Sequence, residues 1–150
     1  MEQEELYNLQ DKMEQATEEE RMAELLKHFP EFKLQTARIG LSPKGANKYR
    51  VTIKNGSLKF TTTFTDSIYN TCNQTPSSKI DILYCVVMDA QCYESTGTLE
   101  DFADNFGYDL YEERGKAKKC FYGCERAYDN LTELFGTEGY EILNCITYGL

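Results

Sequence analysis

The first thirty residues carry apolar side chains at the spacing of an amphipathic helix. These residues recur at steps of three and four, lose phase and then restart: Leu6, Leu9, Met13 and Ala16, then Met22, Leu25, Leu26 and Phe29. Thr17 lies where the pattern restarts, and with Glu20 three residues later it forms a candidate capping box. The sequence therefore predicts either one helix broken near residue 17 or two helices. The segment should end before Pro30, because a proline disfavours helical geometry at the residue that precedes it.

Apolar and polar residues alternate with a period of two between residues 48 and 64, which is typical of β-strands. Asn55-Gly56 interrupts the alternation and is a strong signal for a hairpin turn. A two-residue turn at this place predicts three cross-strand pairs: Lys54–Ser57, Ile53–Leu58 and Val51–Phe60. Residues 32–40 are expected to add a third antiparallel strand, joined through a turn at residues 42–45. The sequence thus predicts a three-stranded antiparallel sheet over residues 31–64.

A strongly apolar segment follows, and eleven of residues 80–93 are apolar. We expect a helix from about residue 79 to 94, capped by Ser78 and buried on all sides. A buried strand over residues 82–88 is the alternative. The centre of this helix should pack on the apolar face of the hairpin, which consists of Val51, Ile53, Leu58 and Phe60.

Helical signals continue to the end of the chain. Thr98 is expected to begin a short helix that ends at Gly107, and Asp109 to cap a long helix that ends at Gly136. A final helix covers about residues 137–148. Together these segments predict a single α+β domain over residues 1–150, with a helical element at 1–30, the sheet at 31–64 and a layer of three to four helices at 78–150.

Charge is distributed unevenly along the 150 residues. The net charge is −9, yet residues 31–79 have a net charge of +6, between −6 over residues 1–30 and −9 over residues 80–150. The opening segment lacks the positive region of a secretory signal, and no apolar run approaches the roughly 20 residues that span a bilayer. We therefore expect a cytoplasmic protein.

The sequence offers little support for metal, cofactor or nucleophilic chemistry. His28 is the only histidine, and Cys120 and Cys124 are the only closely spaced cysteines, on an apolar helical stripe. Neither a P-loop nor a GxGxxG pattern is present. We therefore expect no metal, no cofactor and no enzymatic activity, with the cysteines acting as small, reduced, apolar residues.

The polar side of the hairpin carries four cations that are expected to project together: Lys48, Arg50, Lys54 and Lys59. Such a surface can bind phosphates or an acidic partner. It can equally be a solvated face, or one that the acidic helices of the protein neutralise. No aromatic residue alternates with these cations, so the stacking surface of a single-strand binder is missing.

Six carboxylates gather within fourteen residues of the last block: Glu100, Asp101, Asp104, Asp109, Glu112 and Glu113. They can imitate the charge spacing of a nucleic-acid backbone and occupy a basic channel on another protein. Most of them also fall at predicted helix starts, where capping and the helix dipole favour acids, so a structural role is the alternative. The N-terminal helix offers a second acidic surface, with Glu18, Glu19, Glu20 and Glu24.

Residues 60–68, 76–89 and 101–109 resemble segments of a family of small phage and prophage proteins. The helix with Tyr122, Cys124 and Leu131, closing on residues 134–136, completes a likeness that extends over about residues 47–136. The family continues after its Gly-Tyr-Asp element with Asp-Ser-Arg-Lys-Ala. This chain instead reads Leu-Tyr-Glu-Glu-Arg-Gly-Lys-Ala over residues 110–117, which adds acid and suggests a diverged partner surface.

Some members of that family resemble inhibitors of CRISPR effectors, and the family has no common catalytic residues to carry over. The resemblance implies a phage-encoded, non-enzymatic inhibitor in the cytoplasm of an infected bacterial host. Such a protein would bind a host defence nucleoprotein, with a CRISPR effector as the expected target, and block its nucleic-acid binding through the acidic surface. The alternatives are a nucleic-acid-binding accessory protein that uses the hairpin cations, or a module that self-associates, basic sheet against acidic helix. We expect a monomer or small homo-oligomer that does not contact membranes.

Overall fold

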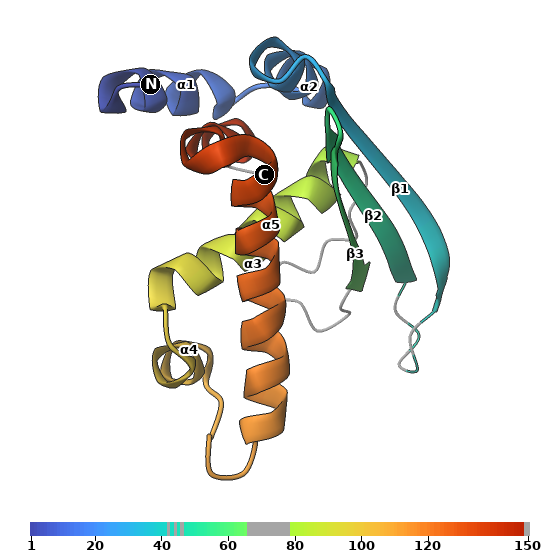
Figure 1. Cartoon of the computed structure of the whole chain (residues 1–150), viewed down its shortest axis with the longest axis vertical. Coiled ribbons are helices and arrows are strands. Elements are labelled where there is room, and N and C mark those ends of the chain that lie inside the picture. The colour runs from blue at the N-terminus through green and yellow to red at the C-terminus, as the bar shows by residue number, and fades with distance from the viewer. Residues whose placement is uncertain (42, 44, 46, 66–78, 149–150) are drawn as a thin grey trace.

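A computed structural model of the chain describes residues 1–41, 43, 45, 47–65 and 79–148. Within these residues, five helices and one sheet follow one another along the chain (Figure 1): α1 (Gln3–Met13), α2 (Glu18–His28), β1 (Phe32–Leu41), β2 (Asn47–Asn55), β3 (Leu58–Thr65), α3 (Lys79–Thr96), α4 (Leu99–Phe106) and α5 (Arg114–Thr147). This confirms the predicted α+β class, with a three-stranded antiparallel sheet between N-terminal and C-terminal helices.

The N-terminal segment forms two helices, and the second begins with the predicted capping box. The Thr17 hydroxyl accepts a hydrogen bond from the Glu20 amide, and the Glu20 carboxylate accepts one from the Thr17 amide, each 3.2 Å long. α2 ends at His28, two residues before Pro30. Of the two arrangements that the sequence left open, the pair of helices is therefore correct.

Arg21 anchors α2 to the C-terminal end of α5. It is only 2% exposed, and its guanidinium donates hydrogen bonds to the carbonyls of Ala16 (3.3 Å), Ile146 (2.9 Å) and Tyr148 (2.6 Å). Carbonyls at the end of a helix carry partial negative charge, which a cation stabilises. Burial lowers the pKa of Arg21. This cation holds the fold together and is not available to a partner.

The sheet has the order β1-β2-β3, and both neighbouring pairs are antiparallel. The hairpin register differs from the predicted one by two residues and gives the pairs Asn55–Leu58, Lys54–Lys59, Ile53–Phe60 and Val51–Thr62. Asn55 is a strand residue because its side-chain amide donates to the Leu134 carbonyl of α5 at 2.9 Å, so Gly56 and Ser57 form the turn. A shift of two residues leaves every side chain on its predicted face. Residues 42 and 44 of the predicted turn at 42–45 lie outside the described residues.

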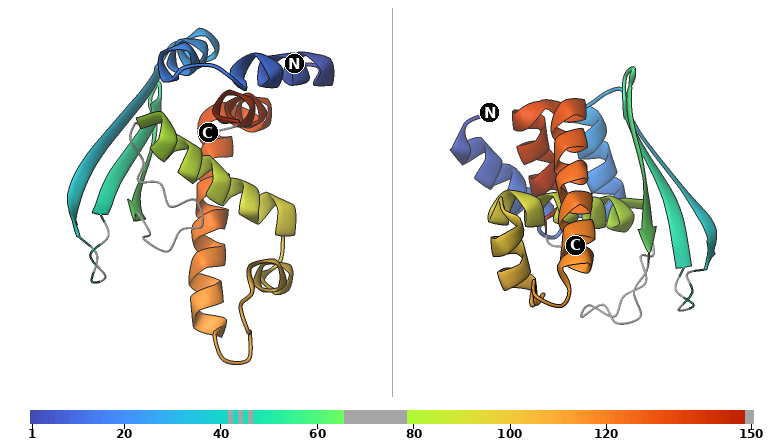
Figure 2. Two further views of the ribbon diagram at one scale, coloured as in Figure 1. Left: turned by 180° about the vertical axis from the view of Figure 1, so that it is seen from behind. Right: turned by 60° about the horizontal axis from the view of Figure 1, so that its bottom comes forward.

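The inner face of the sheet packs against the helices and contributes to the main hydrophobic core (Figure 2). Val51, Ile53 and Phe60 are at most 4% exposed. Burying each of these side chains contributes on the order of 1.5–3 kcal/mol before entropy is counted. Leu58, predicted on the same buried face, is 41% exposed because it directly follows the turn at the end of the hairpin.

The strongly apolar segment forms the helix α3, so the alternative of a buried strand is wrong. The prediction of burial on all sides is also wrong, since Met88 and Asp89 are exposed. α3 crosses α5 and buries the side that carries Ile80, Leu83 and Val87 (Figure 1). The predicted cap Ser78 lies outside the described residues.

α4 and the first part of α5 form the lower part of the molecule in Figure 1, and the end of α5 reaches up to α1. The Thr98 hydroxyl caps α4 as predicted, accepting from the Asp101 amide at 3.2 Å, and Gly107 ends the helix. α5 begins at Arg114 and not at residue 109, because the Asp109 carboxylate instead accepts from the Tyr111 amide at 2.9 Å and closes a turn. The two predicted C-terminal helices are joined into α5, with a kink at Gly136 (φ 77°). None of the described helices combines the length and the apolar character of a membrane span.

Candidate functional site

The side of the sheet that is turned away from the helices carries no described helix, as both views show (Figures 1 and 2). We call this side the outer face. Side chains alternate between the two faces of a strand, so the buried Val51 and Ile53 fix which positions point outward. The register places these residues on the outer face: Lys33, Gln35 and Ala37 of β1; Lys48, Arg50, Thr52 and Lys54 of β2; Lys59, Thr61 and Thr63 of β3.

Three lysines face one another across the three strands, and we call them the lysine row. Lys33 pairs with Lys54, and Lys54 pairs with Lys59 on its other side. Lys33 and Lys59 are exposed and Lys54 is half-buried. Neighbouring strands lie about 4.8 Å apart, and like charges directly opposite each other destabilise a sheet. The row therefore concentrates positive charge at the hairpin end of the outer face.

Two further cations lie toward the other end of β2, and we call them the far pair. Arg50 is exposed, between Ala37 and Thr63, and Lys48 lies two residues before it. The Arg50 side chain helps to line a shallow hollow on the surface of β1 and β2, together with Gln35 and Thr52. The far pair and the lysine row give the outer face five cations.

None of these five cations forms an ion pair with a carboxylate in the described part of the chain. The ion pairs found there join Glu24 to Lys12 and His28, and the terminal amine to Glu138, all away from the sheet. The described outward positions contain no acid and no aromatic residue. The outer face is thus a positively charged surface that can hold several phosphate groups at once.

Arg126 of α5 also reaches the sheet but has a different role. Its guanidinium donates to the Thr61 carbonyl at 3.0 Å and lies 5.2 Å from the centre of the Phe60 ring. These contacts hold α5 against β3.

The structure brings together the four cations that the sequence singled out, Lys48, Arg50, Lys54 and Lys59, and adds Lys33. Lys33 lies in a predicted strand between Phe32 and Leu34, so the alternation alone places it outward. Its position beside Lys54 depends on the register between β1 and β2, which the sequence did not predict.

The six clustered carboxylates lie on α4 and on the turn that leads to α5. Glu100, Asp101, Asp104, Asp109 and Glu112 are exposed, and Glu113 is half-buried. Two of the six are used locally: Asp109 accepts from the Tyr111 amide, and the Glu113 carboxylate accepts from the Asp109 amide at 3.3 Å. Asp109 and Glu113 therefore have a structural role in this turn, and the partner-binding role of the cluster stays a prediction.

Four exposed cations begin α5 directly after these acids, and they were not among the site residues predicted from the sequence: Arg114, Lys116, Lys118 and Lys119. The sequence signal that could have identified them is the run of four bases within the six residues 114–119. Within the described chain none of them forms a direct ion pair with the neighbouring acids. The acidic surface is consequently mixed with positive charge, whereas the outer face of the sheet has one sign only.

Burial disfavours the reactive thiolate form of Cys92 and Cys124, two of the five described cysteines. Burial raises the pKa of Cys124 to about 12 and also raises the pKa of Cys92. The exposed Cys120 has its sulfur 3.1 Å from the Tyr108 hydroxyl. His28 pairs with Glu24 at 3.3 Å. Among the described residues, no group of three or more acidic, cysteine or histidine side chains is placed to hold a metal ion.

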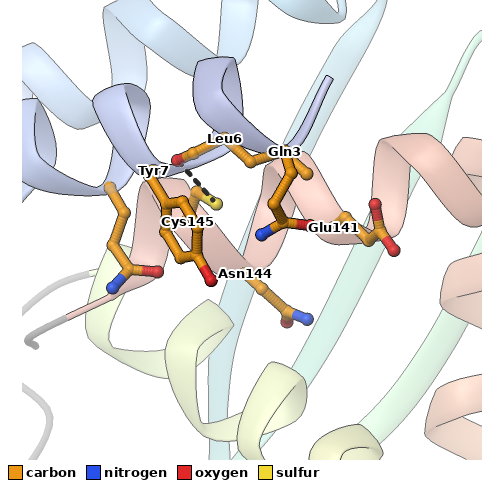
Figure 3. A pocket seen from close by; sticks show the side chains of 7 residues that line it. Gln3, Leu6, Tyr7, Glu141, Asn144 and Cys145 are labelled. Atoms are coloured by element: carbon orange, nitrogen blue, oxygen red, sulfur yellow. Dashed lines mark hydrogen bonds between the residues drawn. The ribbon is translucent and has the colours of Figure 1, made fainter. Parts of the chain in front are cut away.

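A hollow between α1 and the last turns of α5 is lined by mixed side chains (Figure 3). Tyr7 and Gln3 come from α1, and Glu141, Asn144 and Cys145 come from α5. The Cys145 thiol donates to the Leu6 carbonyl at 3.5 Å, and burial raises its pKa. A protonated thiol that is engaged in this way is a poor nucleophile.

Comparison with known proteins returned no matching family model, no matching curated protein and no matching solved structure.

Proposed function

We propose that this protein binds nucleic acid by holding its phosphate backbone against the outer face of the sheet. The observation that carries the proposal is the lysine row, in which three like charges lie side by side and none forms an ion pair with a described carboxylate. This repulsion is relieved when a polyanion lies across the row. Lysine and arginine contacts of this kind release counterions from nucleic acid and require no particular base sequence.

The net charge of −9 does not oppose this interaction. The described acids lie on the helices and their connections, and the described strands contain six bases and no acid. Charges in physiological salt are screened over about 8 Å, so a phosphate at the outer face senses mainly the local cations. The acidic helices repel a polyanion from the other sides and so favour the outer face as the point of approach.

The direct test replaces the lysine row in one variant, Lys33→Gln, Lys54→Gln and Lys59→Gln. Fluorescence anisotropy with a labelled DNA duplex at low ionic strength measures its affinity beside that of the wild type. We expect the variant to bind at least about tenfold more weakly. A tenfold loss of affinity corresponds to about 0.5 kcal/mol of binding free energy for each of the three lost phosphate contacts.

The matched control carries Lys116→Gln, Lys118→Gln and Lys119→Gln, which change the net charge by the same amount on α5. We expect this control to retain most of the wild-type affinity. An equal loss in both variants, or no binding by the wild type, would contradict the proposal.

A second proposal keeps the acidic surface as the functional one, in an inhibitor of a host defence nucleoprotein such as a CRISPR effector. It is favoured by the exposure of Glu100, Asp104 and Glu112, whose carboxylates form no direct ion pair in the described chain. These three are better targets than Asp109 and Glu113, which support the local turn. Reversing all three to lysine should abolish the capture of such a nucleoprotein from a host lysate, and unchanged capture would contradict this proposal.

A further inference from the structure

We infer that the nucleic acid taken by the outer face is double-stranded DNA, with its major groove lying across the sheet. This inference rests on the function proposed above. It comes from one juxtaposition: two groups of cations separated along β2 by about the width of that groove, with only small or uncharged side chains between them.

The chemistry of the outer face disfavours a single strand. Proteins that bind single strands without sequence preference stack the bases on aromatic side chains, in addition to contacting the backbone. The described outward positions of the three strands hold no aromatic residue. A duplex does not need such a surface, because its bases are already stacked on one another.

The spacing of the cations fits two backbones. Lys54 of the lysine row and Arg50 of the far pair are four residues apart on β2, which corresponds to about 13 Å along an antiparallel strand. The major groove of B-form DNA is about 12 Å wide. The lysine row can therefore contact the phosphates on one side of the groove, while Arg50 and Lys48 contact those on the other.

The centre of the outer face carries groups that suit the floor of a groove. Gln35, Thr52 and Thr61 lie between the two groups of cations, and the hydroxyls of Thr52 and Thr61 are 3.5 Å apart. Amide and hydroxyl groups form hydrogen bonds with the base edges of the major groove. The major groove of A-form RNA is deep and narrow and does not admit protein in this way, so the geometry favours duplex DNA over duplex RNA.

The test uses the full chain and three labelled probes of one sequence: a DNA duplex, an RNA duplex and a single DNA strand, each about two helical turns long (about 20 nucleotides or base pairs). Anisotropy titrations at one low ionic strength give the three affinities. We expect the DNA duplex to bind at least about tenfold more tightly than either of the other probes. Equal affinity for all three probes, or tighter binding of the RNA or the single strand, would overturn the inference and leave the proposed function standing. If no probe binds, the proposed function fails as well.

A variant of the far pair, Lys48→Gln with Arg50→Gln, tests the spacing itself. It keeps the lysine row, so we expect it to bind all three probes with similar, reduced affinity and to lose the preference for duplex DNA. A variant that keeps that preference would overturn the two-backbone arrangement. Thermal melting checks that the variant is folded; its residues lie on the outer face and not in the core.

Discussion

Glu24 is a buried acid whose charge is held by cations from two helices. It is 8% exposed, and its carboxylate accepts a hydrogen bond from Lys12 of α1 at 3.1 Å and pairs with His28 of α2 at 3.3 Å. Burial by itself raises the pKa of Glu24. The hydrogen bond from Lys12 and the charges of Lys12, Lys27 and His28 lower it by more than burial raises it, so the pKa lies below its ordinary value of 4.5. Glu24 therefore joins α1 to α2 most strongly when it is ionised.

This arrangement predicts how stability depends on pH. Because the folded-state pKa is lowered, the contribution of Glu24 is fully present above about pH 4.5, and it is lost as the pH falls through the folded-state value. At neutral pH we expect Glu24→Gln to lower the free energy of unfolding by about 0.5–1 kcal/mol, as is typical of a partly exposed ion pair. Thermal melting of both proteins from neutral to acidic pH measures the difference. A difference that stays constant into the acidic range would contradict this role.

At the scale of elements, the sequence predicts what local patterns control and misses what tertiary contacts decide. The alternation in β2 and β3 and the capping box at Thr17 are local, and both are confirmed. The predicted hairpin register is wrong, because the hydrogen bond from the Asn55 side chain to the Leu134 carbonyl involves a partner 79 residues away in the sequence. The predicted start of α5 is also wrong, because Asp109 closes a turn and does not cap the helix. An aspartate that closes a turn and one that caps a helix look alike in the local sequence.

The left-handed backbone of the hairpin turn at Gly56 can be tested by substitution. Gly56 has φ +65°, and a Cβ at this position would lie 2.6 Å from the Glu31 carboxylate. The Glu31 side chain can move aside, but the left-handed backbone strains any L-residue with a Cβ, so we expect Gly56→Ala to lower the free energy of unfolding by about 1–2 kcal/mol.

Gly123→Ala is the matched control for this change. Gly123 lies inside α5, and a Cβ at this position would meet no other atom within 4 Å outside the backbone of its own helix. Alanine is the better helix former, so this control should raise the free energy of unfolding by about 0.5–1 kcal/mol. Urea denaturation of the two variants and the wild type compares them, and equal effects of the two substitutions would contradict the left-handed turn.

The whole molecule is electrically divided, which its net charge conceals. The described strands carry a net charge of +6, and the rest of the described chain carries −15. The four cations of the hairpin were evident in the sequence, because alternation alone places them on one face. The lysine row was not, since Lys33 joins Lys54 only through the pairing of β1 with β2. The cations that follow the acidic cluster were also visible in the sequence, as four bases within residues 114–119, but they were not among the predicted site residues.

The most direct test of the central claim is the salt dependence of binding to a DNA duplex, measured for the wild type and for the lysine-row variant. Each phosphate contact contributes about −0.9 to the slope of log K against log salt. If the five cations of the outer face each contact a phosphate, the wild type should show a slope of about −4.5, and the variant that lacks three of them a slope of about −1.8. Equal slopes for the two proteins, or a wild-type slope near zero, would contradict binding through the outer face of the sheet.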